Sequence, residues 1–385
     1  MDFNLKEEQQ QFAEALRRWI DKDYSFETRR QIIASPGGVS AAAWNTLAEL
    51  GMTALPVPEQ HGGFSGSAVD LYVVMKELGR ALVVEPYFAT VLGAQFLRRG
   101  GGHGNLLEQV AAGELKLACA LHERQGRHEL ADIVTRARVD GSGFVLDGRK
   151  SVVVHGAEAG ALIVSARVSG SQREHAGIAL LVVAADAAGV TINGYRSLDG
   201  QRAADIVFDG VKLDGSAVIG VAGAGWDILD ACADYGAALL CAEALGAMEA
   251  LFDATLDYLK TRQQFGAPIG KFQALQHRMA DMFIHLEQAR SMALLAAVKA
   301  DAADADERRR AVSAAKYRIG EAARFIGQQA VQLHGGMGVT NELIAAHHFK
   351  RLAMIELTLG DGDHHLRRFM AQPGFGGSAV QDAHA

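Results

Sequence analysis

The residues best suited to binding a charged ligand lie in the stretch TRQQFGAPIGKFQ, from Thr261 to Gln273. Arg262 ends an amphipathic helical pattern, where its planar guanidinium can present a fork of donors to a pair of phosphates. Gly266 permits a left-handed helix end, and Pro268 prevents the helix from continuing. The stretch therefore predicts two helices joined by a turn, with an anion-binding arginine beside the turn. A solvated helix-end cation is the alternative for Arg262.

The same stretch resembles a signature of the acyl-CoA dehydrogenase family, R-x-x-F-G-x-P-I-x-x-F-Q…A-D-M. The residues that match the signature are Arg262, Phe265, Gly266, Pro268, Ile269, Phe272, Gln273, Ala280 and Asp281. One helix later, QLHGGMG resembles a second signature of the family. Its matching residues are Gln332, Gly335, Gly336 and Gly338. The resemblance spans nearly the whole chain.

This resemblance implies a flavoprotein that binds FAD. In the family, the arginine and the glutamine of the two signatures reach across a subunit interface to the FAD pyrophosphate and adenosine. The Gly-Gly turn lets the backbone approach the same dinucleotide, because glycine has no Cβ. The resemblance implies FAD-binding roles for Arg262, Gln264, Phe265, Ile269, Phe272, Gln273, Gln332, Gly335, Gly336 and Val154.

Two hallmarks of the family are altered in the middle of the chain. Typical members read T-E-P-x-x-G-S-D where this chain has HERQGRHE at 122–129, and K-x-W-I-T-N-G where it has KSVVVHG at 150–156. Val152 therefore replaces the tryptophan that shields the flavin, and Val154 replaces the threonine whose hydroxyl meets the ring. Valine keeps the backbone amide but removes the side-chain donor, so we expect a bound flavin with altered redox behaviour. His155 is expected to be a turn histidine, with a contact to the flavin or substrate as the alternative.

The usual catalytic base is missing from both positions where the family carries it. Acyl-CoA dehydrogenation needs a carboxylate that removes the α-proton while hydride passes to the flavin. The usual glutamate position falls on Leu359, and the alternative position, on the first helix of the bundle, falls on Gly236. Asp361 lies two residues further on, between Gly360 and Gly362, which make the loop pliable. We therefore predict that Asp361 is the base.

Other roles compete with this one. Asp361 precedes a helical run and can act simply as its N-cap. A metal site formed with Asp363, His364 and His365 is another alternative, but one loop alone gives poor convergence, and we predict no metal. Asp234 aligns with a family position near the acyl-CoA thiol arm. It is expected to contact the substrate, with a solvated helix-end acid as the alternative.

The chain can also be a subunit that lacks its own base. The stretches HGGMGVTNELIAAHHFKR and LTLGDGDHHLRRF resemble small chains of two-gene acyl-CoA dehydrogenases, such as the small subunit of pimeloyl-CoA dehydrogenase. The resemblance implies dehydrogenation of an acyl-CoA thioester, with electrons passed to an electron-transfer flavoprotein. It implies a homodimer or homotetramer, or a heteromer with a larger acyl-CoA dehydrogenase subunit. A catalytically silent subunit that completes a partner's FAD site is the competing hypothesis.

Composition agrees with these expectations. A chain of 385 residues exceeds what one hydrophobic core usually serves, and its net charge of −7 argues against nucleic-acid binding. Cys119, Cys232 and Cys241 are widely spaced, which suits buried thiols in a reducing cytosol. The sequence shows neither an apolar signal core nor an uninterrupted apolar run of membrane-spanning length. We therefore expect a cytoplasmic protein without a membrane partner.

The elements that must position these residues change character twice along the chain. Residues 1–114 read as helices, and residues 115–222 as short β-branched strands bounded by turns. Residues 223–372 return to the helical period, and residues 373–385 read as a flexible tail. The expected fold is α+β, with an N-terminal helical domain, a middle antiparallel β-barrel and a C-terminal four-helix bundle.

Overall fold

The computed structural model describes residues 6–373. These residues form two compact units that interleave along the chain. The helical unit comprises residues 6–22, 68–83 and 234–373, and the β unit comprises residues 23–67 and 84–233. The predicted tail, beyond its first residue, lies outside the described chain. The linear division into three domains at residues 114, 222 and 372 stays a prediction.

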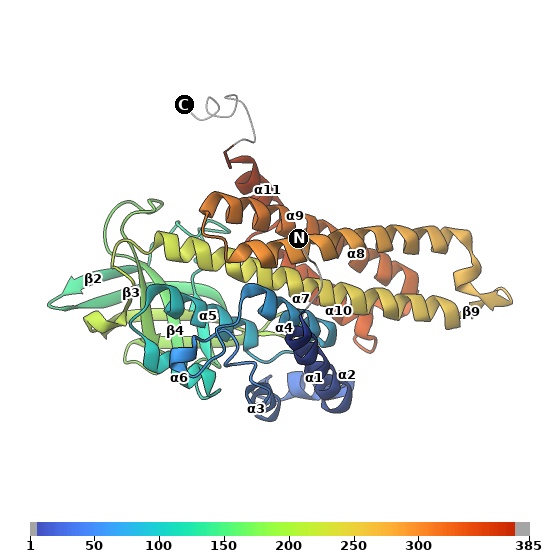
Figure 1. The fold of residues 1–385 in the computed structure, drawn as a ribbon, viewed down its shortest axis with the longest axis horizontal. Helices are drawn as coiled ribbons and strands as arrows, with labels where there is room; N and C mark the ends of the chain where they lie inside the picture. The colour runs from blue at the N-terminus through green and yellow to red at the C-terminus, as the bar shows by residue number, and fades with distance from the viewer. Residues whose placement is uncertain (1–5, 374–385) are drawn as a thin grey trace. The chain divides into compact units, whose positions relative to one another are not determined.

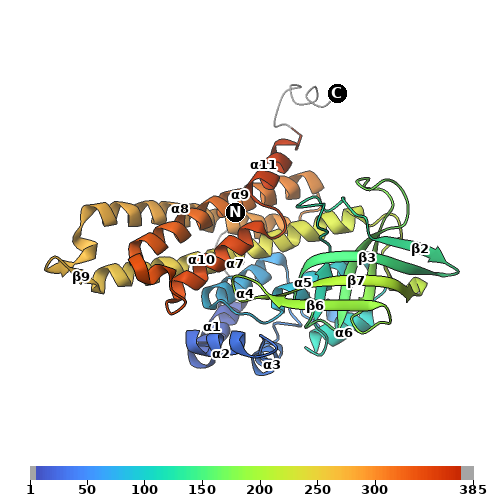
Figure 2. The same ribbon diagram turned by 180° about the vertical axis from the view of Figure 1, so that it is seen from behind.

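The helical unit is built around the long helix α9, which packs against its neighbours α8, α10 and α11 (Figures 1 and 2). The buried face of α9 carries several small side chains, among them Ala315 and Ala322, which lie with Ile319 and are each at most 1% exposed. Small side chains let the helix axes approach closely. The helices of this unit are α1 (Glu7–Asp23), α4 (Ala68–Ala81), α7 (Trp226–Thr261, of which the unit contains the part from Asp234), α8 (Gln273–Ala300), α9 (Ala305–His334), α10 (Ile344–Leu357) and α11 (Gly362–Met370).

The β unit contains one eight-stranded sheet and short helices. Its strands are β1 (Leu117–Ala120), β2 (Arg136–Asp140), β3 (Gly143–Val154), β4 (Ala161–Arg167), β5 (Ile178–Ala184), β6 (Val190–Arg196), β7 (Arg202–Leu213) and β8 (Val218–Ile219). Its helices are α2 (Phe26–Ala34), α3 (Ala41–Glu49), α5 (Tyr87–Gly100) and α6 (Gly104–Ala111). Helix α5 packs closely on β1, since a Cβ at Gly93 would lie 2.6 Å from the Leu117 Cβ.

The sheet is open, so the expected β-barrel is wrong. The strand order is β6-β7-β3-β2-β4-β5-β8, with β1 on β4, and within the described chain no pairing joins β6 to β8. Nor is the sheet wholly antiparallel, because β1 and β2 both pair with β4 in parallel. Closure depends on whether the first and last strands meet. Alternating side chains reveal a buried face, but they carry no information about that meeting.

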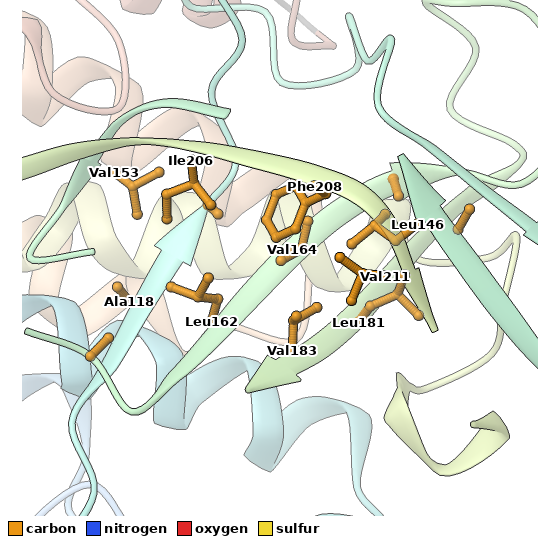
Figure 3. Packing of buried hydrophobic residues seen from close by; sticks show 14 of the residues in the cluster. Ala118, Leu146, Val153, Leu162, Val164, Leu181, Val183, Ile206, Phe208 and Val211 are labelled. Atoms are coloured by element: carbon orange, nitrogen blue, oxygen red, sulfur yellow. The ribbon is translucent and has the colours of Figure 1, made fainter. Parts of the chain in front are cut away.

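The two halves of the open sheet bury their apolar faces against each other. Arg136 and Arg167 form the one register pair recorded between β2 and β4, so the sheet is narrow at this point. Figure 3 shows Val153, Ile206 and Phe208 from β3 and β7 facing side chains of β1, β4 and β5. The strand framework that carries positions 150–156 is therefore packed on a dry core.

Helix α7 is long and apolar enough, by length and composition, to cross a membrane. Its most apolar window is 83% buried inside the molecule, as expected for the core helix of a folded domain. Cys232 and Cys241 lie on this helix and are buried, in agreement with their expected role as small core residues.

Candidate functional site

The fold of the helical unit brings the two signature stretches to the same end. Tyr258, near the end of α7, stacks on His334 at the end of α9 with ring centroids 4.6 Å apart. The start of α8 joins them, because Nη1 of Arg278 donates to Oε1 of Gln329 at 3.2 Å. We call this region, formed by residues 258–278 and 329–338, the signature end. Its two stretches are far apart in the sequence, and antiparallel helix packing brings them together.

The turn at the signature end is a β-hairpin, whereas the sequence predicted a glycine-capped helix end. Helix α7 stops at Thr261, and β9 (Gln263–Gln264) pairs with β10 (Ala267–Pro268). Phe265 and Gly266 have φ values of 54° and 77°, as a two-residue type I′ turn requires at both central positions. Figure 1 shows β9 projecting beyond the paired ends of α7 and α8. The hairpin therefore presents Phe265, which is 91% exposed.

The signature end gathers the groups that a dinucleotide needs. Arg262 and Gln332 are exposed, and apart from the adjacent residues no atom of the described chain lies within 4 Å of where a Cβ would stand on Gly335 or Gly336. Guanidinium, amide and accessible backbone donors suit phosphates, and an exposed aromatic pair suits a planar ring. Ile269 is half-buried, and the other exposed members of the predicted FAD set here are Gln264, Phe272 and Gln273. This donor set fits FAD.

The strand that carries Val152 and Val154 belongs to the β unit and is strained. A bulge interrupts the pairing of β3 with β7 between Lys150 and Val153. Within the bulge, Val152 has φ of 54° and its side chain is 51% exposed, while its N–H donates to Oδ1 of Asp205 at 3.1 Å. A β-branched residue in the left-handed region costs about 1–3 kcal/mol, and such strain clusters at functional sites. Val154 is half-buried beside it.

His155 is the turn histidine that the sequence predicted. It is 2% exposed, and its Nε2 donates to Oε1 of Gln201 at 2.8 Å. Its Nδ1 lies 3.4 Å from Oε2 of Glu158. Both ring nitrogens therefore face protein groups, one in the same turn and one just before β7.

A buried ion pair occupies the altered hallmark at residues 122–129. Nζ of Lys150 donates to Oε1 of Glu123 at 2.8 Å, and both side chains are nearly inaccessible to solvent. Burial lowers the pKa of Lys150, and the negative charge of Glu123 offsets only part of that effect. Burial raises the pKa of Glu123, but the ammonium and its hydrogen bonds outweigh burial, so this pKa lies below its usual value. Sequence reasoning missed the pair, because 27 residues separate the partners.

Asp361 caps helix α11, as one of the sequence alternatives proposed. Its Oδ1 accepts a hydrogen bond from the His364 N–H at 2.8 Å, and Asp361 itself is half-buried. His365 is buried, and its Nε2 donates to the Leu359 carbonyl at 3.0 Å. Burial lowers the pKa of His365 well below its usual value, so the ring is neutral. Over residues 6–373, no group of three or more His, Cys, Asp or Glu side chains is placed to hold a metal.

Lys316 on α9 is a buried cation that sequence reasoning did not identify. Its Nζ donates to three carbonyl oxygens, those of Ile355 at 2.9 Å, Glu356 at 3.0 Å and Gly360 at 2.8 Å. Burial lowers the pKa of Lys316 to about 8. A lysine within a helix carries no local signal for this role, because its partners lie 39 to 44 residues away, in the last turn of α10 and in the loop that follows it.

Two other carboxylates of the helical unit are held by arginines. Asp234 is 1% exposed and pairs with Arg308, at 2.8 Å, and with Arg368. The solvated helix-end alternative for Asp234 is therefore wrong, since the helices α9 and α11 cover it. Glu243 lies two helical turns beyond Gly236 on α7 and forms a bidentate pair with the guanidinium of Arg351.

Comparison with known families matches most of the chain to three domain descriptions. Residues 6–114 match the acyl-CoA dehydrogenase N-terminal domain, residues 118–211 its middle domain, and residues 223–372 its C-terminal domain.

Individual relatives cover nearly the full length. Acyl-CoA dehydrogenase IpdE2 of Mycolicibacterium smegmatis is 30% identical over 369 residues, which are 96% of this chain and 99% of the relative. The solved structure of a Tcur3481-Tcur3483 steroid ACAD variant is 28% identical with a TM-score of 0.86, covering 94% of this chain and 96% of that one. The FAD complex of PigA is 26% identical with a TM-score of 0.89, covering 98% of this chain and 100% of that one.

Proposed function

The chain belongs to the acyl-CoA dehydrogenase family, and on this premise we propose that it is an FAD-dependent acyl-CoA dehydrogenase. It introduces an α,β double bond into an acyl-CoA thioester and passes the electrons to an electron-transfer flavoprotein. The observation that carries the proposal is the convergence of Arg262, Gln332 and the open Gly335-Gly336 backbone at the signature end. These groups belong to both family signatures, and their chemistry suits a dinucleotide.

The residues of the signature end hold the cofactor in this proposal. The Arg262 guanidinium binds the diphosphate, and Gln332 with the glycine backbone binds nearby oxygens of the dinucleotide. Phe265 gives an apolar surface that one chain leaves 91% exposed, which supports contact with a second subunit. The bound FAD supplies a hydride acceptor. In the β unit, Val154 keeps its own backbone amide, which supplies a donor that its side chain lacks.

Asp361 is the proposed base that removes the α-proton. Leu359, at the usual position of the base, has no ionisable group, and Gly236 has no side chain. Asp234 and Glu243 are each held in buried arginine pairs. Asp361 lies at the N-terminus of α11, where its Oδ1 accepts the His364 N–H at 2.8 Å and its side chain is half-buried.

Anaerobic mixing of the purified chain with FAD and a panel of acyl-CoA thioesters tests this function. We expect the flavin absorbance to bleach with at least one thioester, because the substrate transfers two electrons to the bound cofactor. Omission of the thioester is the control. A chain that binds FAD and bleaches with none of the panel would contradict the proposal of an autonomous enzyme.

A second candidate is a catalytically silent subunit of a heteromer. The apolar Leu359 at the usual base position and the valines at positions 152 and 154 favour it. Compared with typical members of the family, these residues remove the base, the tryptophan that shields the flavin and the hydroxyl that meets its ring. In this case the bound flavin never bleaches with the chain alone. Bleaching appears only when a larger acyl-CoA dehydrogenase subunit with its own glutamate is added and co-purifies with this chain.

The assembly and its location stay proposals. We propose a homodimer or homotetramer, or a heteromer as above, with Phe283 and Ile284 of α8 at an interface, since each is at least 50% exposed. A cytoplasmic location rests on the scattered cysteines. Asp234 is proposed as a substrate contact through its family position, although it also holds two arginines.

Replacement of Arg262 by methionine is expected to weaken FAD binding about 10- to 100-fold. A hydrogen bond to a charged group contributes about 1.5–3 kcal/mol, and each 1.4 kcal/mol corresponds to about a tenfold change in affinity. Titration of the apo-protein with FAD, followed by flavin fluorescence, measures the change. Lys260 is exposed in the last turn of the same helix, so Lys260→Met is the matched control and should bind FAD as the wild type does. Equal losses in both variants would indicate a general charge effect.

A further inference from the structure

The ammonium of Lys316 uses all of its hydrogen-bonding capacity on one short segment of backbone. An ammonium has three donors, and here each has a carbonyl partner within 3.0 Å. Ile355 and Glu356 lie in the last turn of α10, and Gly360 lies immediately before Asp361. The last carbonyls of a helix lack partners within the helix and carry partial negative charge, which a cation stabilises. Lys316 therefore ties the end of α10 to the residue next to the proposed base.

Further contacts fix the backbone on both sides of Asp361. The Gly362 N–H donates to Oε1 of Glu356 at 3.2 Å, and the Leu359 carbonyl accepts from His365 at 3.0 Å. Leu359 itself has φ of 56°, in the left-handed region that a leucine rarely adopts. Such a conformation persists only where the surrounding contacts maintain it. The loop at 358–362 is thus held in one strained conformation. Lys316 donates three hydrogen bonds to the backbone in the loop and in the last turn of α10 before it.

Packing alone does not explain a lysine at position 316. Its side chain is 2% exposed, and burial of an ammonium is strongly unfavourable unless polar partners compensate. A methionine would fill a similar volume without any desolvation of charge. A charged lysine can hold the three carbonyls in a fixed arrangement by hydrogen bonds, and an apolar side chain cannot. This arrangement therefore explains why a lysine occupies the position.

We propose that Lys316 is a positioning residue, which sets the conformation of the loop at 358–362 and through it the place of the Asp361 carboxylate. The inference rests on the proposed function, because it requires Asp361 to remove the substrate proton. A misplacement of about 1 Å in a reacting group can reduce a rate by about 10²-fold, so a small change in this loop has a large kinetic consequence.

Protonation of Lys316 should control the same contacts. The titratable groups that face it are Cys241 from α7, Glu356 from α10, and Asp361 and His365 from the α11 segment. Because the pKa of Lys316 is lowered to about 8, the neutral amine appears in mildly alkaline solution. A neutral amine has two N–H donors for three carbonyls. The loop should therefore loosen as the pH rises through about 8.

Two readouts test the proposal with Lys316→Met. In the first, amide hydrogen exchange over residues 358–364 is measured without FAD or substrate, and we expect faster exchange than in the wild type. In the second, flavin reduction by an acyl-CoA is measured, and we expect kcat to fall on the order of 10²-fold with KM little changed. Lys299→Met is the matched control, since Lys299 pairs with the partly exposed Glu307 in the first turn of α9 and should leave both readouts unchanged.

The outcomes separate this inference from the proposed function. Unchanged loop exchange in Lys316→Met, or faster exchange with undiminished kcat, would overturn the positioning role. If none of the acyl-CoA thioesters reduces the flavin of the wild-type chain, the proposed function is overturned. The exchange experiment would still report on the contact between Lys316 and the loop. If Lys316→Met does not fold, the pH dependence of amide exchange in the wild type tests the positioning role instead. After correction for intrinsic rates, its loop exchange must accelerate as the pH rises through about 8, and a flat profile overturns the proposal.

Discussion

Replacement of Asp361 by asparagine is expected to slow flavin reduction by acyl-CoA about 10²- to 10⁴-fold while leaving the fold and FAD binding intact, because it removes a general base. Asparagine is as good a helix N-cap as aspartate, so the hydrogen bond from the His364 N–H should survive the change. The amide cannot take up the α-proton of the substrate. The experiment therefore separates the two roles that the structure and the sequence assign to Asp361.

Stopped-flow reduction of the FAD-loaded protein measures this effect. Asp363→Asn is the matched control, because Asp363 is exposed in the first turn of the same helix and should reduce flavin at the wild-type rate. Asp361→Ala should show the same kinetic loss and, in addition, lose about 1 kcal/mol of stability with the cap. Wild-type reduction by Asp361→Asn would show that Asp361 is a cap and that the proton goes elsewhere.

Replacement of Lys150 by methionine is expected to lower the free energy of unfolding by about 3–5 kcal/mol, because it leaves a buried carboxylate without its counter-charge. The Glu123 carboxylate would keep the N–H groups of Val134, at 2.8 Å, and Thr135, at 3.1 Å. Those donors do not neutralise its charge. The Lys150 ammonium also donates to Oγ of Ser165 at 3.0 Å and so links β3 to β4, a contact that methionine cannot make.

Urea denaturation followed by circular dichroism measures the loss. Arg138→Met is the control, because the Arg138–Asp147 pair is 2.8 Å long but exposed, and solvent screens such a pair so that it contributes little to stability. The double variant Glu123→Gln with Lys150→Met should recover part of the stability, since it removes both charges. Equal effects of Lys150→Met and Arg138→Met would contradict the assignment of a strong buried pair.

The sign of the pH dependence follows from the direction of the Glu123 shift. Its folded-state pKa lies below the usual glutamate value, so the pair contributes its stability fully above that value. The contribution is lost as the pH falls through the lowered pKa. The difference in stability between the wild type and the double variant should therefore shrink in acid and remain constant near neutral pH.

The sequence by itself determined the order of secondary structure and the family. The helical period predicted over residues 223–372 corresponds to α7, α8, α9, α10 and α11, which all lie within that range. Local pattern is sufficient here, because the spacing of apolar residues and the position of glycine and proline report directly on a helix and its ends. The two signatures likewise identified the groups that the fold gathers at one end of the helical unit.

Only the tertiary structure decided how distant segments meet. The open edges of the sheet depend on which strands become neighbours. The hairpin at Phe265 depends on positive φ values at both central residues of its turn, and a phenylalanine at the first of them does not predict a positive φ. The partners of Lys150, Lys316 and Asp234 lie between 15 and 134 residues away in the sequence. Each of these side chains is a charge that burial makes costly, and only packing shows which group compensates it. For that reason the sequence identified the chemistry, and the three-dimensional arrangement identified the residues that hold it in place.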